Sequence, residues 1–243
     1  MLDSINLKQV LFIDIETVPQ FVNFEAVPES MKKHWKKKSL FFRADEETAE
    51  DTYNRAGIYA EFGKIVCITV GAVTGESDNF GFKIKSYFGD DEKKLLTEFS
   101  EMIVGLEEKS QIYLCAHNGK EFDYPYISRR LLINGLKLPQ VFDNAGKKPW
   151  EVRHLDTLEL WKFGDYKHYT SLDLLTVIFN IPSPKDEFDG SQVSEIYYEE
   201  KNLEKIVQYC ERDVLAIAQL MMRYTNSPLI DSSKVVSATF SGS

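Results

Sequence analysis

The sequence predicts an α/β fold, in which helices flank a central mixed β-sheet. Apolar runs typical of strands come first along the chain, and amphipathic helical patterns are interleaved with them later. The chain has 243 residues, of which 43% are hydrophobic, so it can bury a substantial core. We expect a single domain over residues 1–225, followed by a C-terminal tail over residues 226–243.

Each predicted element rests on a local pattern. Strand-like apolar runs lie at about 9–15, 64–73, 79–87, 111–116 and 152–157. Helical periodicity appears at about 91–108, 123–134, 170–179 and 202–224. Residues 20–62 form an insertion between the first two strands. The final residues, SATFSGS, carry no periodic pattern and predict a loose tail.

Composition limits the class of protein. No apolar run approaches the roughly 18 residues that cross a bilayer, and the N-terminal residues do not resemble a secretory signal. Cys67, Cys115 and Cys210 lie in apolar segments, as small core residues of an intracellular protein do. We therefore expect a cytoplasmic location and no membrane partner. The formal net charge of −9 argues against a broad basic nucleic-acid surface, but it does not exclude an enzyme acting on nucleic acid.

The first strand ends in two acidic residues. In VLFIDIETVP, residues 10–19, four large apolar residues lead into Asp14 and Glu16. Side chains alternate between the two faces of a strand, so these carboxylates point the same way.

A third acidic residue follows the strand at 111–116. The loop His117–Asn118–Gly119–Lys120 leads to Asp123, where a helix begins with Pro125 in its first turn. Taken alone, Asp123 is interpreted more readily as an N-cap than as a ligand.

The last helix carries an acidic residue on its apolar side. At 100° per residue, one apolar stripe of residues 202–222 contains Leu203, Ile206, Cys210, Val214, Ile217, Leu220 and Met221. Asp213 falls within this stripe and Tyr209 lies at its margin, whereas Glu204, Gln208 and Glu211 lie on the opposite, solvent side. Burying a carboxylate costs several kcal/mol unless it is paired or coordinated. A salt bridge to a basic core residue is the alternative to a ligand role.

Together these acidic residues indicate a metal centre. Four carboxylates from three distant segments converge only if something positive holds them, and oxygen ligands suit Mg²⁺ or Mn²⁺. Two such cations about 4 Å apart are an established apparatus for the attack of water on a phosphodiester, one activating the nucleophile and the other stabilising the leaving 3′-oxygen. His117, His154 and His168 have no ligand spacing and are interpreted as ordinary polar residues.

These residues, in this order, resemble the tyrosine branch of the DEDD superfamily of 3′→5′ exonucleases. Asp14, Glu16 and Thr17 match its Asp-x-Glu-Thr motif; Asn118, Phe122 and Asp123 match Asn-x-x-x-(Phe/Tyr)-Asp; Tyr209 and Asp213 match Tyr-x-x-x-Asp. The histidine branch would have His where this chain has Gln208. The chain most resembles the proofreading domain of family B DNA polymerases, here as a stand-alone chain, over residues 10–220. The resemblance implies a ribonuclease H-like fold.

The resemblance also implies roles. Asp14, Glu16, Asp123 and Asp213 would bind two divalent cations, and Tyr209 would orient the attacking water. Thr17, Asn118 and Phe122 would hold the last two nucleotides. Two weaker motifs match as well: Ser171, Leu172 and Leu175 fit a strand-binding motif, although Ser171 is also a plausible helix cap. Lys185 and Phe188 fit a Lys-x-x-apolar motif whose lysine assists catalysis.

The expected activity is release of nucleoside 5′-monophosphates from a 3′ end, with single-stranded DNA favoured over RNA. A non-catalytic module that binds nucleic acid or a replication or repair protein, and an RNA-trimming exonuclease, are the alternatives. The basic stretch MKKHWKKKSLFFR, residues 31–43, also has two interpretations. It forms a solvated helix pair with the acidic residues after it, or its lysines (Lys32, Lys33, Lys36, Lys37 and Lys38) contact phosphates while Trp35 stacks on a base.

Overall fold

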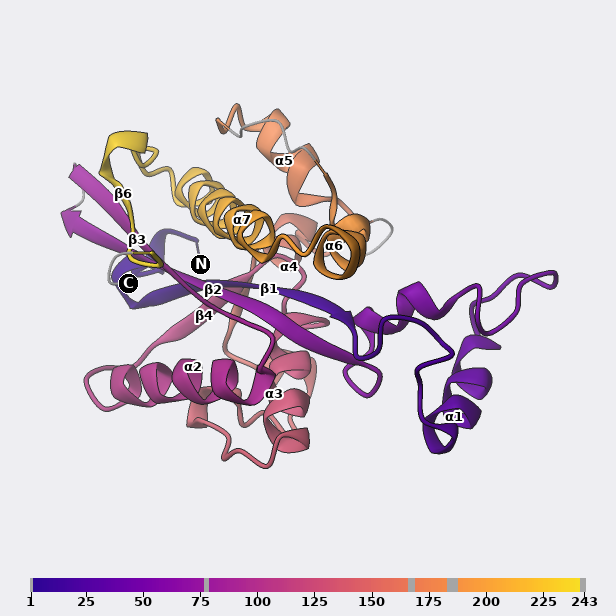
Figure 1. Cartoon of the computed structure of the whole chain (residues 1–243). Coiled ribbons are helices and arrows are strands. Elements are labelled where there is room, and N and C mark those ends of the chain that lie inside the picture. The colour runs from indigo at the N-terminus through magenta and orange to yellow at the C-terminus, as the bar shows by residue number, and fades with distance from the viewer. Residues whose placement is uncertain (1, 77–78, 166–168, 183–187, 241–243) are drawn as a thin grey trace.

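A six-stranded mixed sheet forms the centre of the protein in the computed structural model (Figure 1). The structure describes residues 2–76, 79–165, 169–182 and 188–240. The strand order is β5-β4-β1-β2-β3-β6. The strands are β1 (Val10–Pro19), β2 (Gly63–Glu76), β3 (Asn79–Phe88), β4 (Tyr113–Ala116), β5 (Leu155–Asp156) and β6 (Val235–Ser237).

The sheet is mixed because two kinds of connection build it. β1, β2 and β3 form an antiparallel meander, with Asp14 opposite Thr69 and Glu16 opposite Cys67. β4 lies parallel to β1, with Phe12 opposite Cys115, and β5 lies parallel to β4. The predicted α/β class with a central mixed sheet is confirmed, as are the approximate places of its first five strands.

Helices cover both faces of the sheet, with α2 and α3 on one face and α7 on the other (Figure 1). The helices are α1 (Glu29–Ser39), α2 (Glu92–Glu107), α3 (Asp123–Ile133), α4 (Thr157–Lys162), α5 (Leu172–Ile178), α6 (Val193–Glu195) and α7 (Leu203–Tyr224). Short helical turns lie in the segments between these elements. They include η3 (Tyr53–Ile58), the π-helical η7 (Ile196–Glu200) and η8 (Ser232–Lys234). No helix in the described part of the chain is long and apolar enough to cross a membrane.

The alternation of β1 assigns each of its side chains to one layer. Leu11, Ile13 and Ile15 pack in the apolar cluster beneath α2 and α3. Val10 and Phe12 pack in the cluster beneath α7, and that row continues along the strand to Asp14 and Glu16. The acidic residues therefore extend a row whose earlier members are core residues.

The insertion projects from the end of β1 as a lobe with its own apolar centre (Figure 1). Trp35 of α1 is fully buried there, and its indole N–H donates a 2.7 Å hydrogen bond to the Ala49 carbonyl. The interpretation of Trp35 as a base-stacking residue was wrong, because its ring is enclosed by Phe42, Tyr53 and Phe62. The expected helix pair was also wrong, since the acidic residues 44–51 form turns.

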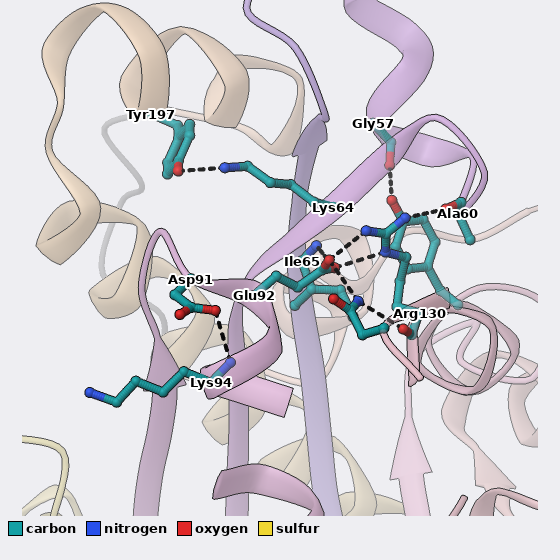
Figure 2. A network of polar contacts seen from close by, with 11 residues as sticks. Gly57, Ala60, Lys64, Ile65, Asp91, Glu92, Lys94, Arg130 and Tyr197 are labelled. Carbon is teal, nitrogen blue, oxygen red and sulfur yellow. Dashed lines mark hydrogen bonds and ion pairs between the residues drawn. The ribbon is translucent and has the colours of Figure 1, made fainter. Parts of the chain in front are cut away.

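A buried ion pair anchors this lobe to the sheet and to α3 (Figure 2). Both guanidinium Nε and Nη2 atoms of Arg130 donate to the Glu92 carboxylate, and Nη1 donates to the Ala60 carbonyl at 2.9 Å. Glu92 also accepts from the Ile65 backbone N–H at 2.7 Å. The Tyr126 hydroxyl donates to the Gly57 carbonyl at 2.7 Å. The base of the lobe is thus fixed to α3, the helix that begins with Asp123.

The C-terminal segment differs from the loose tail that we expected. β6 pairs in parallel with β3 and so extends the sheet. Glu211 of α7 accepts hydrogen bonds from the hydroxyl groups of Ser86, Ser237 and Thr239. Glu211 was expected to face solvent, and a periodicity argument missed these contacts because they come from a segment without periodicity.

Candidate active site

The acidic pair on β1 lies directly beneath α7. The Sγ of Cys210 lies 3.3 Å from Oδ2 of Asp14, and ligand atoms of Asp14, Glu16 and Cys210 all lie within 4.8 Å of one another. The register between β1 and β2 shifts immediately after this pair, between Glu16 and Thr17. Such bulges re-aim side chains and are frequent beside functional sites.

Asp213 and Tyr209 on α7 lie beside the same acidic pair. The buried face of α7 includes Val207, Cys210, Val214 and Ile217, as the apolar stripe predicts. Asp213 and Tyr209 lie at the margin of this face and line a cavity of about 270 Å³ together with Asp14. The other lining residues are His117, Tyr169, Ser171, Leu172, Asp173, Thr176 and Ala216.

Asp123 approaches the pair from α3. Its side chain is buried, and its Oδ1 atom has no hydrogen-bond partner within the described residues. The N-cap of α3 is Phe122, and Asp123 is the first helical residue, so the interpretation of Asp123 as a helix cap is wrong. An unpartnered buried carboxylate oxygen is costly, and such an atom calls for an explanation such as an ion.

The pKa shifts indicate that these carboxylates are buried and interact electrostatically. Burial, with the neighbouring charges of Asp123 and Asp213, raises the pKa of Asp14 well above its ordinary value. Burial and the charges of Asp14 and Asp213 likewise raise the pKa of Glu16. Burial is also the main reason that the pKa of Asp123 rises to about 7. Carboxylates in such surroundings are ionised together only when a positive charge compensates them.

These residues fit a site for divalent cations. Asp14 and Glu16 place carboxylate oxygens, the hard ligands that Mg²⁺ and Mn²⁺ prefer, within 4.8 Å of each other, and the unpartnered Oδ1 of Asp123 is left available to a ligand. No ion pair within the described residues joins a lysine or arginine to Asp14, Glu16 or Asp123. The salt-bridge alternative was stated for Asp213, and for that residue it stays a prediction.

Tyr209 is held in place by packing. Its ring lies 4.7 Å from the ring of the buried Phe188, centroid to centroid. Burial, followed by the charges of Asp213, Glu16 and Asp14, raises the pKa of Tyr209, and a hydrogen bond with Asp213 acts in the same direction. The phenol therefore stays protonated at neutral pH and remains a hydrogen-bond donor.

The opposite wall of the cavity comes from α5 and from the loop after β4. Ser171 caps α5 by accepting a 3.2 Å hydrogen bond from the Leu174 N–H, so the capping interpretation is confirmed, and Ser171 and Leu172 also line the cavity. His117 lines it too, which sequence reasoning missed. Its Nδ1 and Nε2 atoms are engaged by Thr157 Oγ1 and the Thr170 carbonyl, each at 2.9 Å.

Three of the remaining predicted residues, Thr17, Asn118 and Phe122, are described by the structure but are not among the residues that line this cavity. Asn118 has a left-handed φ of 62°, and its N–H donates to Asp156 at 3.0 Å. Phe122 packs on Tyr126, with ring centroids 5.3 Å apart. Thr17 directly follows the bulge. Lys185 lies outside the described residues. Cys210, which was interpreted only as a core residue, contacts Asp14. Only the way in which α7 packs on β1 reveals this contact.

Comparison with known proteins adds a family. Residues 58–229 match a family model described as a predicted 3′→5′ exonuclease related to the exonuclease domain of PolB. The matched range contains Asp123, Tyr209 and Asp213, whereas Asp14 and Glu16 precede it. Among solved structures, the chain is similar to the family B DNA polymerase from the hyperthermophilic archaeon Pyrobaculum calidifontis, with a TM-score of 0.46 and 15% identity. That similarity covers 88% of this chain and 24% of the polymerase, so the chain spans about a quarter of the polymerase's length.

Proposed function

This chain belongs to the family of predicted 3′→5′ exonucleases related to the exonuclease domain of PolB, and from that premise we propose a specific reaction. The protein hydrolyses phosphodiester bonds at the 3′ end of single-stranded DNA and releases nucleoside 5′-monophosphates. The observation that supports this proposal is the buried acidic pair Asp14 and Glu16 beneath α7, where burial, together with the charges of neighbouring carboxylates that include Asp213, raises both pKa values.

Asp14, Glu16, Asp123 and Asp213 would hold two divalent cations, Mg²⁺ or Mn²⁺. When bound, these cations would activate water and stabilise the charge that develops on the leaving 3′-oxygen. The rigid placement of the ligands supports this role, since β1, α3 and α7 each hold their acidic residues through buried apolar neighbours. Preorganised ligands avoid reorganisation at the moment of reaction.

Tyr209 would orient the attacking water. Its hydroxyl is a donor at neutral pH, it lines the cavity with Asp14 and Asp213, and Phe188 restrains its ring. Thr17, Asn118 and Phe122 would hold the terminal nucleotides, while Ser171 and Leu172 would contact the strand from the α5 side of the cavity. Lys185 would assist catalysis, as its motif implies.

The test is digestion of a 5′-labelled single-stranded DNA oligonucleotide with Mg²⁺ or Mn²⁺, beside a matched RNA. We expect a ladder that shortens from the 3′ end of the DNA, with 5′-mononucleotides as products. Asp213→Asn should abolish it, whereas Glu204→Gln, at an exposed position of the same helix, should not. Shortening of the RNA alone would reassign the substrate to RNA.

A second measurement separates binding from chemistry. Mn²⁺ at 100 times its Kd should stabilise the wild type by about 2.7 kcal/mol, because it binds only the folded state. For a domain of this size that is a rise in Tm of roughly 5–10 °C, which Asp213→Asn should lose or strongly reduce. Stabilisation by Mn²⁺ without any shortening between pH 7 and 9 would contradict the enzymatic proposal and favour a non-catalytic module.

A further inference from the structure

The lobe carries a cationic surface that the proposed chemistry does not use. α1 turns Trp35 into the lobe's apolar centre, and at 100° per residue Lys33 and Lys37 point away from it, with Lys36 at the edge of the same side. All three lysines are exposed. Just beyond the helix, the side chain of Phe41 is 81% exposed. We call Lys33, Lys36, Lys37 and Phe41 the basic face.

The lysines of the basic face are only partly compensated within the lobe. The Lys36 ammonium lies 5.9 Å from the centroid of the Phe24 ring. The hydrogen bond from Lys32, with a smaller contribution from the charge of Lys36, lowers the pKa of Glu29. Among the described residues, Lys33 and Lys37 make no ion pair. The ion pair that α1 makes among the described residues joins Lys32 to Glu29. The acidic turn after α1 binds its own backbone, since Glu47 accepts from the Ala44 N–H and Asp51 from the Thr48 N–H, both at 2.8 Å. The helix dipole favours cations in the last turn, but it does not account for Lys33, and like charges at Lys33 and Lys37 are unfavourable at i,i+4 spacing.

The lobe is placed where a strand leaving the site could meet it. It begins directly after β1, four residues beyond Glu16, and it projects from that end of the sheet (Figure 1). The network around Arg130 and Glu92 fixes its base to α3 through the Ala60 carbonyl (Figure 2). The base of the lobe that carries the basic face is therefore held in place against α3, the helix that begins with Asp123, and a preorganised binding surface needs such an anchor.

We propose that the basic face binds the single-stranded polynucleotide upstream, on the 5′ side, of the nucleotide in the cavity. This inference rests on the proposed function, because it takes the same strand as the ligand. The three ammonium groups contact successive phosphates, and Phe41 provides a platform on which a base stacks. Charge complementarity favours this occupant, since an acidic protein presents here three exposed lysines, two of them without an ion pair among the described residues, beside an exposed aromatic ring.

The experiment measures binding by fluorescence anisotropy, with 5′-fluorescein dT20 and dT4 on the Asp213→Asn background so that the oligonucleotides stay intact. The test variant combines Lys33→Ser, Lys36→Ser and Lys37→Ser. The matched control replaces three exposed lysines outside the lobe: Lys83, Lys93 and Lys109. Both variants change the net charge equally.

We expect the test variant to bind dT20 about tenfold or more weakly, with a log K against log salt slope reduced by about 2, as three lost phosphate contacts imply. dT4 affinity and the control variant should be unaffected. Phe41→Ala should weaken dT20 binding while leaving the salt slope unchanged. Equal losses in test and control variants, an unchanged slope in the test variant, or equal affinity of the Asp213→Asn parent for dT20 and dT4 would overturn the proposal.

Hydrolysis of thymidine 5′-monophosphate p-nitrophenyl ester, which is too short to reach the lobe, separates the two proposals. The triple lysine change, made in the otherwise wild-type chain, should leave this hydrolysis unchanged. Failure of the wild type to cleave the ester and the DNA would count against the proposed function, while the anisotropy result would still decide the basic face.

Discussion

Replacing Asp123 with asparagine tests the central electrostatic reasoning. Burial raises the pKa of Asp123 from its ordinary 3.8 to about 7, so the folded protein binds this proton more tightly than the unfolded chain does. The stability that the proton confers is complete below pH 3.8 and is lost as the pH rises through about 7. The full shift, about 3 pH units, corresponds to roughly 4 kcal/mol.

Most of that loss falls in an accessible range. Between pH 5 and pH 8 without divalent cations, Asp123 alone should lower the free energy of unfolding by about 2–3 kcal/mol. Asp14 and Glu16, whose pKa values are also raised, should steepen the decline. Asp123→Asn removes the charge with little change of shape, so the variant should be more stable than the wild type by about 4 kcal/mol at pH 8 and by only about 1.5–2 kcal/mol at pH 5.

The assay is urea denaturation in EDTA at pH 5, 6, 7 and 8. Glu121→Gln, at an exposed position two residues earlier, is the control and should follow the wild type. Adding Mn²⁺ at pH 8 should stabilise the wild type and not Asp123→Asn. Parallel pH curves for Asp123→Asn and the wild type would refute the reasoning, because they would show that the folded protein ionises Asp123 without cost.

Three further predictions concern the scaffold. Arg130→Met should lower the free energy of unfolding by about 3–5 kcal/mol in urea denaturation, because it leaves the buried Glu92 carboxylate without its partner. The control, Lys94→Met at an exposed position, should lower it by less than about 0.5 kcal/mol. Equal losses in the two variants would contradict this prediction. Gly63→Ala should lower the Tm and reduce the free energy of unfolding by about 1–3 kcal/mol, because the added Cβ would lie 2.3 Å from the Tyr126 hydroxyl oxygen. An unchanged Tm would show that the lobe shifts to accommodate the methyl group. Ser171→Ala should cost about 0.5–2 kcal/mol through the lost cap of α5, and Ser171→Asp should restore it.

The acidic residues of the site could be foreseen because local rules place them. Alternation along β1 puts Asp14 and Glu16 on one side. Helical periodicity places Asp213 within the apolar stripe of the last helix, and the structure places it at the margin of that stripe. Neither rule depends on distant contacts. The sequence could not show that the β1 row faces α7, which is why the contact of Cys210 with Asp14 was missed.

The insertion was predicted less well, and for a physical reason. Its charged runs suggested two helices facing each other, whereas an aromatic cluster around Trp35 organises the lobe and the acidic residues form turns. In a small apolar centre one tryptophan supplies much of the buried surface, so it is drawn inward even from a lysine-rich segment. β6 was missed because a three-residue strand has too few residues to show a pattern.

The anchor of the lobe has an evolutionary consequence. Arg130 and Tyr126 bind it through the carbonyl oxygens of Ala60 and Gly57, groups that every amino acid possesses. Mutations on the lobe's outer surface can therefore accumulate without weakening its attachment. Descendants of this protein could acquire different surface side chains there while keeping the same hydrogen bonds to α3.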